Sequence, residues 1–139
     1  MMENEVLFSL KPQFAELIEK KKKTHEFRKY QPKTAPTRLW FYITSPVSEL
    51  IYIADVKPVV QYPNRIPTIG YGNEDFNNGL KKSKFAFPIT HLYKLKQPLT
   101  LKTLKDKYGF TAPQGFAYMR KYPKLYNEVI NKIGIEQIF

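Results

Sequence analysis

Two long β-prone runs joined by a short turn constrain the fold of this sequence more than any other feature. "RLWFYITS" (residues 38–45) and "ELIYIADVKPVV" (residues 49–60) are rich in aromatic and β-branched residues, which favour strands. They meet at "SPVS", a connection short enough for a hairpin-like turn. A shorter β-prone run, "VLFSL" (residues 6–10), precedes them. This clustering predicts a sheet built from several short strands.

Helical segments are interspersed with these runs in no regular alternation. Residues 12–23, "PQFAELIEKKKK", begin at a proline suited to a first helical turn and carry apolar residues at helical spacing. Residues 100–109 offer Thr100 as a cap and Gly109 as an end. The amphipathic run 123–134 closes on a glycine and predicts a last helix.

The remaining stretches complete the expected architecture. Residues 61–84 form a long excursion with one short helical turn at "NEDFNNGL". "FAFPITHLYKLKQP" (residues 85–98) is interrupted by Pro88, which predicts an edge or bulged strand. Five or six short strands with a few helices predict one α+β domain over residues 1–139. Its antiparallel or mixed sheet is expected to curl into a partly closed β-barrel flanked by short helices.

Net charge indicates the class of partner. Lys+Arg 23 against Asp+Glu 12 gives +11, and a folded basic domain suits a polyanion whose counterions are released on binding. Nucleic acid is the expected partner, with an acidic protein as the alternative. No apolar run approaches the ~20 residues that span a bilayer, so no membrane contact is expected. An acidic N-terminus and the lack of cysteine predict an intracellular protein, cytoplasmic or nuclear.

The residue types exclude several kinds of site. Without cysteine there are no disulfides, thiolate nucleophiles or cysteine-ligated metals. His25 and His91 lie far apart and outside any ligand spacing. "GYGNED" lacks the lysine and the helix context of a phosphate-binding loop. No metal or cofactor is therefore expected, and the available chemistry is that of lysine, glutamate, arginine, threonine and tyrosine.

The stretch "KKKTHEFR" (residues 21–28) is the most specific local pattern. On a strand, Glu26 and Arg28 project from one face, and Lys23 stands at the preceding helix-to-strand corner. A carboxylate held beside two cations is a fixed hydrogen-bond acceptor, suited to the exocyclic amine of a base. Composition alone favours a simpler interpretation, a surface ion pair of little energetic weight.

This stretch resembles the signature of the ASCH domains, a branch of the PUA-like superfamily, which reads G-x-K-x-x-E-x-R. Lys23, Glu26 and Arg28 match, while the glycine position holds Lys21, a residue that resists the positive φ that glycine allows. The strand, "KP" and helix before the signature, and the strand pair after it, are similar to the family over residues 6–56. "TAPQGFAYM" is similar to a Pro-Gln segment near the C-terminal end of some bacterial members.

The resemblance implies a five- or six-stranded β-barrel with a cleft near the signature that faces RNA or another nucleic acid, and RNA is expected ahead of DNA. Glu26 would read a single-stranded or modified base in that cleft. Aromatic side chains there would stack on bases, although aromatics in a small domain more often belong to the core. The residues expected to bind nucleic acid are Lys11, Lys23, Glu26, Arg28, Thr44, Ser45, Gln114, Phe116 and Tyr118.

An enzymatic alternative comes from small ASCH proteins that resemble amidohydrolases acting on an acetylated cytidine nucleoside through a Lys, a Thr nucleophile and a Glu. Lys23 matches the lysine, but the nucleophile position falls on Glu26. Thr24 stands two residues early and needs a rearrangement to attack. Catalytic roles for Lys23, Thr24 and Glu26 are therefore expected only if the chain is an enzyme, and the sequence favours a binding module.

Overall fold

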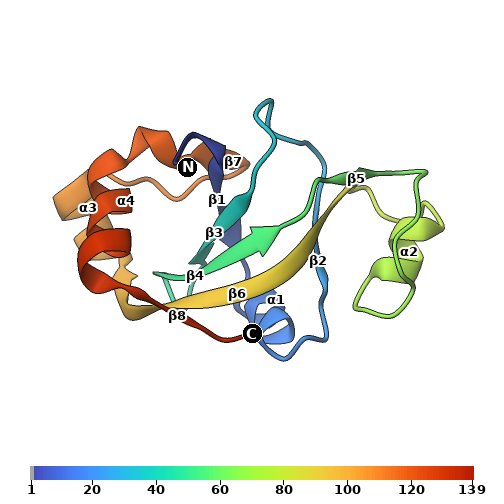
Figure 1. Cartoon of the computed structure of the whole chain (residues 1–139), viewed down its shortest axis with the longest axis horizontal. Helices are drawn as coiled ribbons and strands as arrows, with labels where there is room; N and C mark the ends of the chain where they lie inside the picture. Colours follow the sequence, from blue (N-terminus) through green and yellow to red (C-terminus); the bar gives the residue numbers. More distant parts are fainter. Residues whose placement is uncertain (1) are drawn as a thin grey trace.

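Strands and short helices are mixed along the chain, which confirms the expected α+β class (Figure 1). The computed structural model describes residues 2–139. The helices are α1 (Pro12–Glu19), α2 (Asn73–Asn77), α3 (Leu101–Tyr108) and α4 (Pro123–Glu128), with a π-helical turn over Val129–Ile133. The strands are β1 (Glu5–Leu10), β2 (His25–Arg28), β3 (Arg38–Ile43), β4 (Glu49–Val56), β5 (Val60–Gln61), β6 (Phe85–Thr100), β7 (Phe116–Tyr118) and β8 (Ile135–Gln137).

The strands of residues 2–139 join in one curled mixed sheet, a half-barrel with the order β2-β6-β4-β3-β1-β7. β1 runs parallel to β3, and every other pairing is antiparallel. β5 and β8 add to β6 outside this path. The barrel does not close, because β2 and β7 stand at the two ends of the strand order. We call the gap between β2 and the β1–β7 pair the open seam.

Both faces of the sheet are covered, which explains the long apolar run in β3. Every residue of β3 except the first is buried, the pattern of a strand packed on both sides. On one face Phe41 packs in a cluster with Ile18 of α1. On the other face Trp40 packs with Leu104 of α3 and Leu125 of α4. Figure 1 shows α3 and α4 together at one end of the sheet.

The helix ends test the sequence signals directly. The Thr100 hydroxyl accepts a hydrogen bond from the Thr103 backbone N–H, and Gly109 closes α3 at φ 62°, which confirms both predictions. The prediction of a helix over residues 12–23 was too long, because α1 ends at Glu19. Lys21 adopts φ 61°, and this left-handed turn directs the chain toward β2. The expected ASCH corner is therefore formed, with a lysine in the conformation that glycine favours.

The position of β6 decides between the two alternatives predicted from Pro88, an edge strand or a bulged one. β6 has partners on both sides, β2 and β5 along its first part and β4 and β8 further on. It is therefore not an edge strand. The register against β4 shifts between Asp55 and Val56, close to Pro88, so the predicted irregularity is present. Such a bulge lets a central strand tolerate a residue that has no N–H to donate.

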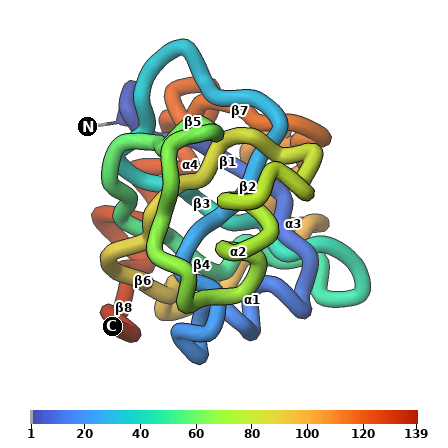
Figure 2. The backbone as a smooth tube through the Cα atoms, turned by 90° about the vertical axis from the view of Figure 1, so that its right-hand side faces the viewer, coloured from blue at the N-terminus to red at the C-terminus, as the bar shows by residue number. Residues whose placement is uncertain are grey.

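Residues 61–84 form a small lobe with its own apolar cluster. The predicted helical turn is present as α2, and Phe76 of α2 packs with Ile66 and against Phe27 of β2. Figure 2 shows the excursion lying in front of β2 when the molecule is seen from the side. The lobe thereby covers one flank of the signature strand. The number of strands exceeds the five or six expected because of three very short strands, β5, β7 and β8, of two or three residues each.

Candidate functional site

A pocket of about 420 Å³ lies at the open seam. Its walls come from four stretches that are far apart in the sequence: residues 8–14 of β1 and α1, residues 26–30 of β2 and the chain after it, Ser83, and residues 114–116 at the start of β7. The pocket exists because the sheet does not close between β2 and β7. The aromatic residues that line it are Phe8, Phe14, Phe27, Tyr30 and Phe116, and the polar ones are Ser9, Lys11, Glu26, Arg28, Lys29, Ser83 and Gln114.

Glu26 is the centre of a buried charge cluster beside this pocket. Arg28 donates from Nε to Glu26 Oε2 at 2.8 Å, which confirms that the two side chains share a face of β2. The Nζ of Lys23 lies 3.5 Å from Glu26 Oε1. Glu26 is 4% exposed and Lys23 5% exposed, so the surface ion pair considered from composition is wrong. Buried charges of this kind need close partners to be tolerated.

Arg28 also bridges the open seam. Its Nη2 donates to the Ser9 backbone carbonyl at 2.7 Å. The pairing of β1 with β7 stops at Phe8, the residue before Ser9. The guanidinium lies over the Phe8 ring, with Cζ 4.1 Å from the ring centroid. A guanidinium packed on a ring and bonded on two sides is held in one orientation. Arg28 therefore fixes both the Glu26 carboxylate and the shape of the pocket.

Lys23 supports Glu26 from behind the pocket wall. Its Nζ lies 4.5 Å from the centroid of the Phe27 ring and 5.5 Å from that of Phe14. Burial lowers the pKa of Lys23, and the nearby charge of Glu26 opposes that shift. Lys23 is absent from the lining of the main pocket. Its role in the structure is to position Glu26.

Thr24 and His25 belong to a separate cluster. The Thr24 hydroxyl lies 2.8 Å from His25 Nδ1 and accepts from Asn73 Nδ2 at 3.1 Å. Burial, followed by the charge of Lys23, lowers the pKa of His25 to about 4, so the ring is neutral at pH 7 and Nδ1 can accept. Lys23 and Thr24 line a second pocket of about 230 Å³, which does not include Glu26.

The structure brings together five of the residues expected at the cleft and leaves four outside the main pocket. Thr44 and Ser45 lie in the turn between β3 and β4 and line none of the pockets described for residues 2–139. The Tyr118 hydroxyl accepts from the backbone N–H of Lys33, and Lys23 lies behind the wall. Those that line the pocket are Lys11, Glu26, Arg28, Gln114 and Phe116.

Sequence reasoning predicted one aromatic residue of the pocket wall, Phe116, and missed the other four, which are Phe8, Phe14, Phe27 and Tyr30. Tyr30 is 74% exposed and stands at the rim. A signal for it existed, since Tyr30 follows Glu26 and Arg28 in the alternation of the strand. Phe8 and Ser9 carried no such signal, because β1 lies far from β2 in the strand order and only the curl of the sheet brings the two strands together.

A curled mixed sheet with a signature strand at its open seam defines a PUA-like protein. A curated relative, the ASCH domain-containing ribonuclease of Zymomonas mobilis subsp. mobilis, is 33% identical over 128 residues, covering 84% of this chain and 85% of the relative. The chain belongs to the ASCH domain family. No family model matches it.

Solved structures agree with this assignment. The crystal structure of ASCH from Zymomonas mobilis is 27% identical, with a TM-score of 0.66 over 90% of this chain and 95% of that one. A variant of that protein with serine replaced by alanine gives a TM-score of 0.68, again at 27% identity, over 90% of this chain and 96% of the other. The half-barrel is therefore the fold of this family.

Residues 2–139 contain neither a candidate membrane-spanning helix nor a candidate metal-binding cluster. Across residues 2–139 no helix combines the length and the apolar character needed to cross a membrane. Within the same residues, no three acidic or histidine side chains come together in a group that could hold a metal ion.

Proposed function

We propose that this chain binds RNA through the pocket at the open seam, with an unpaired or modified base inside it. The observation that carries the proposal is a buried carboxylate, Glu26, fixed by Arg28 at a pocket with aromatic walls. Sequence-specific recognition of RNA generally targets bases that are free to leave the stack and pack on aromatic side chains. The ribonuclease name of the relative makes RNA the first nucleic acid to test.

The chemistry of the pocket favours a base that carries an exocyclic amine. Glu26 can only accept hydrogen bonds, and its position between Arg28 and Lys23 prevents it from turning away. Cytosine, adenine and guanine offer an amine donor to such an acceptor, whereas uracil does not. Lys11 and Lys29, at the pocket rim, are placed to contact the phosphates on either side of the bound base.

Fluorescence anisotropy with labelled single-stranded RNA, duplex RNA and single-stranded DNA tests the proposal. Single-stranded RNA is expected to bind most tightly, because a duplex offers no free base and DNA lacks the 2′-hydroxyl. Lys11→Ala/Lys29→Ala is expected to weaken binding and to flatten its salt dependence. The matched control is Lys57→Ala/Lys82→Ala, which removes two exposed lysines outside the described pockets. Equal losses of affinity in the Lys11→Ala/Lys29→Ala variant and in the control would overturn the pocket assignment.

Base preference gives a second test. Wild type is expected to bind a cytosine-rich strand more tightly than a uracil-rich strand, by about 1–3 kcal/mol for one well-formed contact. Glu26→Gln is expected to reduce that difference more than it reduces overall affinity. Circular dichroism and the urea midpoint must first show that the variant is folded. Gln114→Ala, in an exposed part of the pocket wall, tests the same pocket without altering a buried charge.

A second candidate function is RNA cleavage, which the name of the relative favours. Attack of a 2′-hydroxyl on the adjacent phosphorus forms one P–O bond, giving a 2′,3′-cyclic phosphate, and breaks the bond to the 5′-oxygen, which takes up a proton from water and leaves as a 5′-hydroxyl. The step needs a group to accept the hydroxyl proton and a cation beside the phosphate. Glu26 is the carboxylate of the pocket lining, and Lys11, Arg28 and Lys29 are its cations.

Cleavage is tested with a labelled RNA strand in the presence of a chelator. Fragments are expected with RNA and not with the same strand carrying a 2′-deoxy nucleotide at the cut position. Intact RNA at high protein concentration would leave binding as the function. Acetylcytidine hydrolysis gains no support here, because Thr24 and Glu26 line different pockets.

A further inference from the structure

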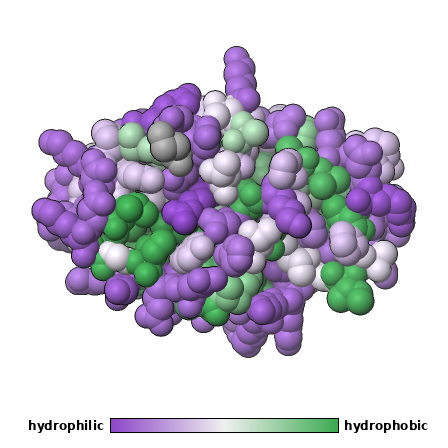
Figure 3. Space-filling view, in the orientation of Figure 1, coloured by the Kyte–Doolittle hydropathy of each residue, from purple (hydrophilic) through white to green (hydrophobic). Residues whose placement is uncertain are grey.

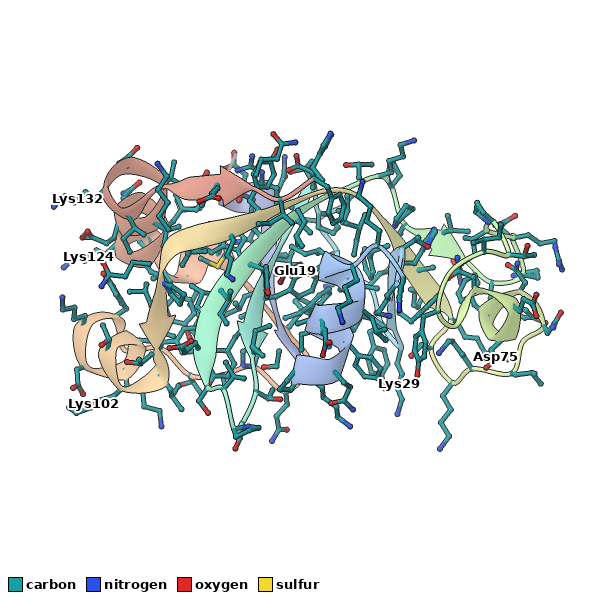
Figure 4. All side chains as sticks on the ribbon, turned by 90° about the horizontal axis from the view of Figure 1, so that it is seen from below. Glu19, Lys29, Asp75, Lys102, Lys124 and Lys132 are labelled. Atoms are coloured by element: carbon teal, nitrogen blue, oxygen red, sulfur yellow. The ribbon has the colours of Figure 1, made fainter. Side chains whose placement is uncertain are left out.

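A groove of about 490 Å³ runs between α3 and the α4 segment, away from the open seam. Figure 4 shows Lys102, Lys124 and Lys132 around this end of the molecule, with Asp75 at the opposite end. In Figure 3, hydrophilic side chains project from the same end around a smaller hydrophobic patch. The residues that line the groove are Lys107, Tyr108, Lys124, Asn127, Glu128, Asn131 and Lys132.

The charge of this region is strongly one-sided. Residues 101–133 contain seven Lys and Arg and two acidic residues, a net charge of +5 out of +11 for the chain. Both acids already have lysine partners on their own helical segment, at 2.8 Å in the Lys102–Asp106 pair and 4.0 Å in the Lys132–Glu128 pair. Within residues 2–139, neither Lys107 nor Lys124 forms an ion pair.

Helix stability accounts for only part of this charge. Lys107 lies in the last turn of α3, where a cation complements the helix dipole. Lys124 lies in the first turn of α4, where the dipole disfavours a cation. Lys124 therefore carries a charge that its own helix does not need, on the opposite wall of the groove from Lys107. Two exposed lysines facing one groove suit a string of phosphates.

We propose that the groove between α3 and α4 is a second contact surface for RNA, which holds the phosphate backbone of the strand whose base enters the main pocket. This inference rests on the proposed function for its ligand, although the groove residues are distinct from those of the pocket. Its polar lining of lysine and asparagine contacts phosphates without reading sequence. The groove therefore adds affinity, and the pocket adds base preference.

The chain between the two sites limits their separation. Tyr108 lines the groove and Gln114 lines the pocket. Six residue steps can span at most about 22 Å. Phosphates follow one another every ~3.4 Å along a stacked strand, so this separation corresponds to about six nucleotides. A strand of at least that length can therefore reach both sites, whereas a dinucleotide, with a single internucleotide phosphate, occupies only one of them.

The test is a salt titration of binding with two ligands of one sequence type, a dinucleotide as the short strand and an oligonucleotide of about 16 nucleotides as the long strand. Each phosphate contact adds about 0.7 to the slope of log affinity against log salt for a single strand. Lys107→Ala/Lys124→Ala is expected to lower the slope for the long strand by about 1.4 and its affinity at 0.1 M salt by about 20-fold. The short strand is expected to bind both proteins equally. The matched control is Lys57→Ala/Lys82→Ala, which removes two exposed lysines elsewhere.

The outcomes separate this inference from the proposed function. If the long strand loses no more affinity in the groove variant than in the control, the groove proposal is wrong whatever the pocket does. If the short strand fails to bind and the long strand still depends on Lys107 and Lys124, the pocket proposal fails and the groove stands. Competition by poly-glutamate as strong as competition by RNA of equal charge would assign the groove to an acidic protein and overturn the inference.

Discussion

Two ion pairs in this protein have the same length and opposite surroundings. Arg28 and Glu26 approach to 2.8 Å with side chains 20% and 6% exposed. Lys102 and Asp106, on α3, also approach to 2.8 Å, but with side chains 86% and 63% exposed. Distance alone would rank them equally. Burial separates them, because water screens the exposed pair and the buried pair depends on its protein partners.

The comparison distinguishes two uses of positive charge. Around Glu26, Arg28 and Lys23 are held by hydrogen bonds, aromatic rings and burial, so each charge has a defined position. On α3 and α4 the lysines are exposed and free to adapt to a flexible polyanion. Defined charges suit the recognition of one base, and adaptable charges suit a backbone that is the same in every sequence.

The largest effect is expected from removing the buried negative charge. Glu26→Gln leaves Lys23 and Arg28 without their shared carboxylate, which should lower the free energy of unfolding by about 3–5 kcal/mol. Urea denaturation measures this directly. Asp106→Asn removes a carboxylate at the same 2.8 Å distance from its partner and is the control. Similar losses in the two variants would mean that burial does not separate the two pairs.

A somewhat smaller effect, about 3 kcal/mol, is expected from acid. His25 has its pKa lowered to about 4 by burial and by the charge of Lys23, against ~6.5 in the unfolded chain. As the pH falls below about 6.5, the unfolded state takes up the proton first, so stability is lost down to about pH 4. His25→Asn keeps a hydrogen-bond acceptor near the position of Nδ1 but has no group that titrates in this range, so it should not show this loss of stability. The difference between the two proteins across this pH window is the quantity to measure.

Relief of backbone strain is expected to have a smaller effect still. Lys21 holds φ 61°, and Lys21→Gly should raise the free energy of unfolding by about 1 kcal/mol. Loss of the contact between Lys21 Nζ and the Phe139 ring, at 4.9 Å, offsets part of the gain. Lys20 has φ −84°, so Lys20→Gly should be destabilising instead. Changes of the same sign in both variants would contradict a strained corner.

The smallest effect should come from the exposed pair. Asp106→Asn is expected to change the free energy of unfolding by no more than about 0.5 kcal/mol. In 1 M salt, where the Debye length is ~3 Å, that difference should disappear. The loss in Glu26→Gln should persist under the same conditions. Thermal unfolding at low and high salt provides both comparisons.

The sequence predicted the parts of the fold that depend on local signals. Thr100 and Gly109 set the ends of α3, as their types indicate. Alternation along the signature strand placed Glu26 and Arg28 on one face. β7 escaped prediction because three residues in a turn-rich segment carry no period. For β6, Pro88 left two alternatives open, an edge strand or a bulged one, and the structure has the bulged one.

The pocket was predictable only in part, since it is made where distant segments meet. Glu26 and Arg28 could be inferred from their spacing, and Lys11, Gln114 and Phe116 from the family resemblance. The burial of Lys23 could not, because it depends on rings contributed by α1 and β2. Thr44 and Ser45 follow β3 in sequence, but the turn that holds them lies outside the pocket.

The open seam has a kinetic consequence. The pocket lies between strands that do not pair with each other, so its entrance is already open in the folded protein. No lid has to move before a ligand enters. Association should then be limited by encounter and by ionic strength rather than by a conformational step. In stopped-flow mixing, the observed rate should rise linearly with ligand concentration and show no plateau.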